Sequence, residues 1–314
     1  MSNVILRVKN LTKKFGNRVA VDDVSFDVFE GEIFGFLGPN GAGKTTTIRL
    51  IAGLAKPDQG NVLICGYSVR NQYEKAIKNL GGIIENPEMY KNFSGLDNLK
   101  YFASLYKGIT RERIDEVVKI VGLSDRIKDK VKSYSLGMKQ RLGIAQALLH
   151  KPKLLILDEP TNGLDPSGII EMRKFLKNTA LKEGIAILIS SHNLAEMELM
   201  CDTIGIISNG KLEKIRAIDQ LNRYNDAEQV YIKVNFPNYA GKLIMSKFNP
   251  DKITIIKNAL TVTISHDKIP EISNLLVSNG IAIYSINAIV KTLEDVFLDT
   301  INKKALPPST TNSN

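Results

Sequence analysis

The sequence GPNGAGKT at residues 38–45 fits the pattern G-x-x-x-x-G-K-[ST], whose glycines let a backbone wrap around a polyphosphate. In such a loop the lysine reaches the β- and γ-phosphates, the threonine hydroxyl ligates Mg²⁺, and the following helix N-terminus adds positive potential. An apolar segment before it and a helical pattern after it favour this reading over a tight turn with a surface lysine. The nucleotide-contacting residues predicted here are Gly38, Pro39, Asn40, Gly41, Ala42, Gly43, Lys44, Thr45 and Thr46.

Two adjacent carboxylates end a second apolar segment, KLLILDEP, at Asp158 and Glu159. Carboxylates at the end of a buried strand are costly unless a cation accompanies them, so a functional role is favoured. Asp158 is expected to hold Mg²⁺ through its water shell, and Glu159 to polarise the attacking water as general base. The two motifs together predict hydrolysis of a nucleoside triphosphate.

Five further residues carry weaker signals, each with an ordinary structural alternative. Ser135 and Gly137 in SYSLGMKQ open a helix, which is either a phosphate-binding N-terminus or simply a good helix start. His192 after ILISS is a γ-phosphate contact or a structural histidine, and Phe15 in KKFGN stacks on a base or belongs to the core. Glu85 ends an apolar strand just before Asn86-Pro87, where it is either a functional carboxylate or a solvated loop residue.

The elements that must position these residues alternate between apolar strands and helical segments. This alternation predicts an α/β layer fold with a mainly parallel sheet, interrupted by a helical insertion over about 94–149. The predicted strands are 4–9, 19–29, 31–37, 62–65, 82–84, 154–157 and 185–189.

Beyond residue 222 the pattern changes to strand 229–236, helix 238–248, strands 252–257 and 260–265, helix 269–279 and strand 281–288. This βαββαβ order is the ferredoxin-like pattern of a small α+β domain. A last helix is predicted at about 291–302, followed by a polar tail that we expect to be disordered. The predicted domains are 1–222, with a helical subdomain at about 86–150, then 223–302 and the tail 303–314.

Composition indicates a globular protein of the cytoplasm. The 314 residues are 43% hydrophobic and 24% charged, and no apolar run is long enough to cross a bilayer. The first residues lack the pattern of a signal peptide, and Cys65 and Cys201 form no C-x-x-C motif, so a reducing compartment is expected. The net charge of +9 is spread along the chain, and its densest basic run, at residues 126–132, is short and mixed with an acidic residue. The charge fits an anionic membrane surface or an acidic partner as well as nucleic acid, so it does not decide between them. No nucleic-acid partner is expected.

Taken together and in this order, the motifs resemble the ATP-binding-cassette ATPases over about residues 3–220. The resemblance implies an adenine-stacking Phe15, a Walker A loop at Gly38–Thr45, a signature at Ser135-Leu136-Gly137-Met138, a Walker B strand ending in Leu157-Asp158-Glu159, a D-loop at Gly163-Leu164-Asp165 and a switch histidine at Ser191-His192.

Two departures narrow the resemblance. The signature reads SLGMKQ, and Glu85 occupies a position usually held by glutamine; both features are similar to the bacitracin and lantibiotic efflux and immunity ATPases. The ending TLEDVFLDT at 292–300 is similar to the tails of drug-export ATPases.

The resemblance implies ATP and Mg²⁺ at two sites shared by a head-to-tail homodimer or heterodimer. It also implies a separate multi-helix membrane permease that docks on the helical insertion at the cytoplasmic face of the membrane. The cargo, a drug or peptide antibiotic, would be selected by that permease. The implied catalytic residues are Lys44, Glu85, Ser135, Gly137, Glu159 and His192, and the implied metal ligands are Thr45, Glu85 and Asp158.

Two alternatives remain. A non-transport ATPase of this family, acting on ribosomes, DNA or cluster assembly, usually carries two cassettes or a long coiled-coil insertion, and neither occurs here. The C-terminal domain is alternatively a regulatory binding module, which is compatible with transport.

Overall fold

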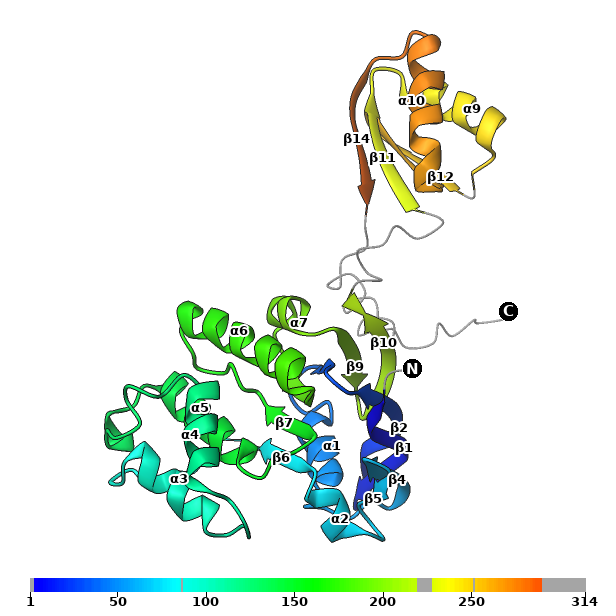
Figure 1. Ribbon diagram of the computed structural model, residues 1–314. Helices are drawn as coiled ribbons and strands as arrows, with labels where there is room; N and C mark the ends of the chain where they lie inside the picture. Colours follow the sequence, from blue (N-terminus) through cyan, green and yellow to red (C-terminus); the bar gives the residue numbers. More distant parts are fainter. Residues whose placement is uncertain (1–2, 86, 219–227, 251, 290–314) are drawn as a thin grey trace. The chain divides into compact units, whose positions relative to one another are not determined.

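The computed structural model describes residues 3–85, 87–218, 228–250 and 252–289. The chain divides into two compact units, Met1–Ile218 and Asp219–Asn314 (Figure 1). The boundary predicted at 222–223, the helix predicted at 291–302 and the predicted tail at 303–314 all lie outside the described residues.

The centre of the first unit is a six-stranded sheet of order β10-β9-β3-β8-β7-β6. The five strands from β9 to β6 run parallel, and β10 is an antiparallel edge strand. The predicted α/β fold with a mainly parallel sheet is therefore confirmed. The strands are β3 (Ile33–Leu37), β6 (Leu80–Ile83), β7 (Leu154–Asp158), β8 (Ala186–Ser191), β9 (Thr203–Ser208) and β10 (Lys211–Ala217).

The carboxyl ends of the three central strands bring the chemical motifs together. Every residue of β3, β7 and β8 is buried, which explains the apolar runs that precede the polar carboxyl ends of β7 and β8. In the parallel register Leu37 pairs with Ser191, and Asp158 pairs with Ser190. The glycine loop after β3, the carboxylates of β7 and the end of β8 consequently meet at one edge of the sheet.

A second, antiparallel sheet of order β2-β1-β4-β5 was not predicted as a separate layer. Its two long strands form a hairpin in which Phe15 pairs with Arg18 across the turn at Gly16-Asn17. Phe26 of this sheet stacks on Phe34 of the parallel sheet, with ring centroids 4.9 Å apart, so one core joins the two layers. Its strands are β1 (Val4–Phe15), β2 (Arg18–Phe29), β4 (Gln59–Ile64) and β5 (Tyr67–Ser68).

The predicted helical insertion consists of three α-helices and one 3-10 turn. Side chains of Ser94, Thr110 and Ser135 each accept a backbone N–H at a helix start, as N-cap residues do. Figure 1 shows α3, α4 and α5 gathered beside β6 and β7, and α1 between the two sheets. The helices of this unit are α1 (Lys44–Ile51), α2 (Tyr73–Ile77), α3 (Gly95–Ala103), α4 (Arg111–Ile120), η1 (Val131–Ser133), α5 (Leu136–Leu148), α6 (Pro166–Glu183) and α7 (Leu194–Met200).

The second unit is a four-stranded antiparallel sheet of order β12-β13-β11-β14 with two helices packed on its apolar face. The βαββαβ order predicted from the sequence is observed. No helix in the described ranges of either unit is both long and apolar enough to cross a membrane. The elements are β11 (Glu228–Val234), α9 (Pro237–Phe248), β12 (Lys252–Ile256), β13 (Ala259–Ile264), η2 (His266–Lys268), α10 (Ile269–Ser278) and β14 (Ile283–Ile289).

Candidate nucleotide-binding and hydrolysis site

The loop between β3 and α1 requires glycine at two positions where its backbone lies close to a neighbouring strand. A Cβ atom on Gly38 would lie 2.4 Å from the carbonyl oxygen of Ile207. Gly43 has a φ of 109°, a left-handed conformation, and a Cβ there would lie 2.5 Å from the carbonyl oxygen of Ala20. Side chains at these positions would push the loop away from the strands that shape it.

Lys44, the first residue of α1, turns its side chain back into this loop. Its Nζ donates to the carbonyl oxygens of Gly38 and Pro39 at 2.7 and 3.3 Å, and lies 3.5 Å from Oε1 of Glu159. The lysine is 5% exposed. An ammonium group can donate three hydrogen bonds, so this geometry fixes a positive charge inside the curve of the loop.

Thr45 and Asp158 come together from segments far apart in the sequence. The Thr45 hydroxyl donates to Oδ2 of Asp158 at 2.9 Å, and the Ser190 hydroxyl donates to Oδ1 of the same carboxylate. Carboxylate and hydroxyl oxygens are hard ligands, so this donor set fits Mg²⁺. Ser190 was not among the predicted site residues, although it directly precedes Ser191-His192 at the same strand end.

Glu159 lies between a buried cation and a histidine. Its Oε2 is 2.8 Å from Nδ1 of His192, and its Oε1 faces Lys44. Its backbone has a φ of 51°, and its N–H donates to both the carbonyl and hydroxyl oxygens of Ser190, at 3.2 and 3.0 Å. These contacts hold the carboxylate in one orientation beside the loop.

Lys44, Thr45, Glu159 and His192 line one cavity of about 570 Å³. Phe15 lies at its edge with 56% of its surface exposed, an arrangement that suits stacking on a base. Arg18 also lines the cavity and donates to the carbonyl oxygen of Gly41 at 3.3 Å. Sequence reasoning missed Arg18, whose only signal is its place opposite Phe15 in the hairpin. The lining residues are Phe15, Arg18, Ala20, Asn40, Gly41, Gly43, Lys44, Thr45, Thr46, Glu159, Asn162 and His192.

Ser135 and Gly137 line a different cavity, of about 470 Å³, together with Gly163 and Asp165. The Ser135 hydroxyl accepts the N–H of Met138 at 3.2 Å and caps α5. Hydrogen bonds from Ser167 and the N–H of Gly168 hold the pKa of Asp165 below its usual value. A single copy of the chain therefore does not bring the predicted signature residues to the Lys44 cavity.

Glu85 is the other predicted residue that lies apart from these groups. Its carboxylate forms an ion pair with Arg49, and its side chain is 64% exposed. Within the described parts of the chain, no hydrogen bond or ion pair joins it to Thr45 or Asp158. The φ of Glu85 is 70°, which is unusual for a residue with a side chain.

A phosphate-binding loop at the carboxyl edge of a parallel sheet, with an acidic strand end beside it, defines a P-loop nucleotide hydrolase. A family model described as "ABC transporter" matches residues 21–162. The chain is 51% identical to the uncharacterized ABC transporter ATP-binding protein YhcH of Bacillus subtilis (strain 168), over 94% of this chain and 95% of that protein. It is also 40% identical to the bacitracin transport ATP-binding protein BcrA of Bacillus licheniformis, over 95% of this chain and 98% of that protein.

Among solved structures, the chain is similar to a dimeric post-hydrolysis state of the ATP-binding cassette MJ0796 bound to ADP and Pi. The TM-score is 0.61 at 25% identity, covering 68% of this chain and 99% of that one. The chain therefore belongs to the ABC transporter ATP-binding proteins. It is an ATPase subunit that powers transport through a separate permease, as the sequence motifs predicted.

Proposed function

We propose that the cavity around Lys44 binds ATP together with Mg²⁺ and hydrolyses it. The observation that supports this is that Lys44, Thr45, Glu159 and His192 line one cavity. Asp158 joins them through the hydrogen bond that it accepts from Thr45. The adenine would stack on Phe15, and the glycine loop would surround the phosphates. Thr45 and Asp158 would hold Mg²⁺, which supplies neutralisation of phosphate charge when bound.

In this proposal the residues of the chain have separate roles in hydrolysis. Glu159 accepts a proton from the attacking water, and His192 keeps the Glu159 carboxylate oriented through its Nδ1 contact. Lys44 stabilises negative charge that develops on the transferred phosphoryl group. Because the buried ammonium of Lys44 already lies 3.5 Å from Glu159, the two charges balance each other before ATP arrives.

We propose that two cassettes pair head to tail, so that Ser135 and Gly137 of one copy complete the site of the other. The separation of the two cavities within one copy supports this arrangement. The partner is a second copy of this chain or a similar ATPase.

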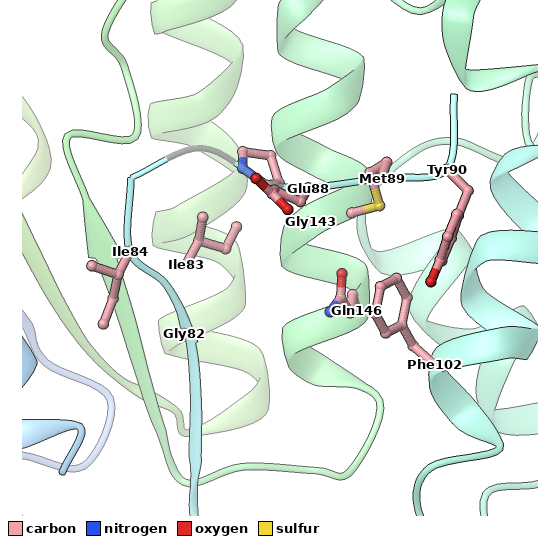
Figure 2. A pocket seen from close by; sticks show the side chains of 10 residues that line it. Gly82, Ile83, Ile84, Glu88, Met89, Tyr90, Phe102, Gly143 and Gln146 are labelled. Atoms are coloured by element: carbon pink, nitrogen blue, oxygen red, sulfur yellow. The ribbon is translucent and has the colours of Figure 1, made fainter. Parts of the chain in front are cut away.

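A groove beside the helical subdomain is the proposed docking site for the permease, at the cytoplasmic face of the membrane. It has a volume of about 500 Å³, and Figure 2 shows Met89, Tyr90 and Phe102 around its space with Ile83 on the opposite side. The Tyr90 ring lies 5.4 Å from Phe93 and 5.1 Å from Tyr101, and all three rings are partly exposed. A groove that combines apolar and aromatic side chains with the polar Glu88 and Gln146 suits a short amphipathic helix of a membrane subunit.

Glu88 provides a test of this docking site, because it is an exposed carboxylate among the groove residues. Glu88→Lys should strongly reduce co-purification with a co-expressed membrane neighbour, while binding of a fluorescent ATP analogue is unchanged. Glu74→Lys, at an exposed position on α2, is the matched control. Undiminished co-purification of Glu88→Lys and its Glu88→Ala counterpart would place docking elsewhere.

We propose that the cargo is a peptide antibiotic or drug carried outward. The support is the 40% identity to a bacitracin transport protein along nearly the whole chain. Deleting this chain from its host should sensitise the host to such a compound, and the intact chain should restore resistance where a hydrolysis-deficient one does not.

The second unit is proposed to be accessory, tuning dimer closure or contact with the permease. Its core and the core of the first unit contain no residues in common, and the ATP-site motifs all lie in the first unit. A chain ending at Tyr224 should therefore remain folded and bind ATP with affinity within about twofold of the full chain, since a domain with its own core can in principle fold alone. Circular dichroism and nucleotide titration measure this. If the shortened chain is folded but does not bind ATP, the second unit is required for nucleotide binding and is not accessory.

A further inference from the structure

A cavity of about 260 Å³ lies at the end of α1, where the chain turns toward β4. Three of its lining residues, Leu50, Val62 and Val69, are apolar and more than nine-tenths buried, so they form an apolar wall. No residue of this cavity lines the Lys44 cavity or the groove beside the helical subdomain. The cavity is therefore separate from both sites, and neither ATP hydrolysis nor permease docking accounts for it.

The turn that follows α1 gives this cavity a fixed shape. Gly53 has a φ of 69°, and a Cβ atom there would lie 2.6 Å from the ring of Tyr73. The N–H groups of Leu54 and Ala55 both donate to the carbonyl oxygen of Arg49, at 2.9 and 3.2 Å. These contacts hold Leu54 at the cavity, although 65% of its surface is exposed.

Two cationic side chains, Lys56 and Arg70, line the same cavity and are exposed. Among the residues that the structure describes, neither side chain has an ion-pair or hydrogen-bond partner. Asn61 adds a polar group beside them. Its Oδ1 accepts the N–H of Val62 and the hydroxyl of Ser68, both at 2.9 Å, which leaves its Nδ2 as a donor for a ligand.

The charge of these two cations is not balanced within the cavity. No carboxylate is found among the described residues that line it, in contrast to the Lys44 cavity and the groove. The carboxylate of Asp58, two residues after Lys56, is already occupied, because it accepts the Nζ of Lys13 at 3.1 Å and the N–H of Lys14 at 2.7 Å. The cavity therefore combines an apolar wall with an uncompensated positive rim.

We propose that this cavity binds an anionic phospholipid of the membrane surface. The lipid phosphate would lie between Lys56 and Arg70, and the first methylene groups of its acyl chains would contact Leu54 and Leu50. A guanidinium group pairs with two phosphate oxygens at once, and an ammonium group adds a point charge. Apolar side chains beside cations are typical of proteins that bind anionic lipid surfaces. The bound lipid would hold the end of α1 at the bilayer surface.

Other ligands use only part of this cavity. A free phosphate would pair with the cations but leave the apolar wall and Leu54 in contact with water. A neutral apolar ligand would leave both cations without a partner. A helix of a protein partner needs an extended groove with apolar anchors along it, and this cavity has about half the volume of the groove, 260 against 500 Å³.

Calorimetric titration of the full chain with dihexanoyl phosphatidylglycerol, a soluble anionic lipid, tests this inference. This lipid should bind more tightly than dihexanoyl phosphatidylcholine and more tightly than inorganic phosphate. Lys56→Met and Arg70→Met should each weaken its binding about fivefold, the effect of one cation at an anionic lipid surface. Leu54→Ser should also weaken it, because the acyl chains lose an apolar contact.

Two exposed residues of α6 provide matched controls. Lys177→Met removes a cation and Leu181→Ser removes an exposed leucine, and both variants should bind the lipid as the unmodified chain does. Equal binding of the two lipids would overturn the inference, as would phosphate binding as tight as that of phosphatidylglycerol. So would lipid binding that none of the variants at Leu54, Lys56 and Arg70 weakens.

This inference does not rest on the proposed ATP site, and nucleotide titration separates the two. Lys56→Met and Arg70→Met should bind ATP with unchanged affinity, because neither residue lines the Lys44 cavity. Failure of the unmodified chain to bind ATP would overturn the proposed function alone. Failure of a chain that binds ATP to bind phosphatidylglycerol would overturn the lipid site alone.

Discussion

Replacing Glu159 with glutamine is expected to slow ATP hydrolysis by about 10²–10⁴-fold, the usual cost of losing a general base. Glutamine has nearly the same shape but cannot take a proton from water. Its carbonyl can still face Lys44 or His192, so the loop that holds the phosphates should be undisturbed. ATP should therefore bind with little change in affinity and accumulate in a closed dimer.

The rate of hydrolysis is measured by phosphate release, and the affinity for ATP by nucleotide titration. Gel filtration in the presence of ATP detects the closed dimer. Glu74→Gln on α2 makes the same chemical change at an exposed position and should leave all three unchanged. His192→Ala removes the contact that orients Glu159 and should reduce the rate while ATP still binds. Turnover of Glu159→Gln at the unmodified rate would remove Glu159 from the mechanism.

The nucleotide loop was predictable from sequence because its physics is local. Gly38, Gly43 and Lys44 are neighbours in the chain, and the conformation that they require is visible in their spacing. The meeting of Thr45 with Asp158, 113 residues apart, was also predictable. Asp158 ends one buried parallel strand, and Thr45 follows another through the glycine loop. The carboxyl ends of such strands share one edge of a sheet.

Features that depend on pairing between distant segments were not predictable in this way. The antiparallel layer arises because β1 pairs with both β2 and β4, and alternating apolar residues do not specify a partner. Arg49 is an arginine in the last turn of a helix, a common place for a basic residue, so nothing in its sequence context marks Glu85 as its partner. The prediction for Glu85 did not include its contact with Arg49, and its functional role stays a prediction.

Replacing Ser135 with arginine is expected to abolish detectable hydrolysis while ATP binding to the Lys44 cavity persists. Ser135 and Gly137 line a cavity separate from Lys44, so a long cation there leaves the copy's own loop intact. In a head-to-tail pair the same arginine would occupy the space where the partner's ATP must fit. Equal loss of binding and turnover would contradict the shared site.

Ser135→Arg also removes the N-cap of α5, and two control variants separate this effect on stability from the effect on the shared site. Ser135→Ala removes the hydroxyl that accepts the Met138 N–H and should cost about 1 kcal/mol of stability, with much smaller loss of turnover. Ser133→Arg adds the same charge at an exposed position in η1 and should leave turnover unchanged.

Mixing two inactive variants gives the most direct test of the shared site. In a mixed pair of Ser135→Arg and Glu159→Gln, one site combines Glu159 of the first copy with Ser135 of the second, and both are unmodified. The other site carries both changes. Mixing should therefore restore turnover above that of either variant alone, with a maximum near equal amounts. If hydrolysis instead used only residues of one copy, every site in the mixture would remain defective, and no ratio would restore activity.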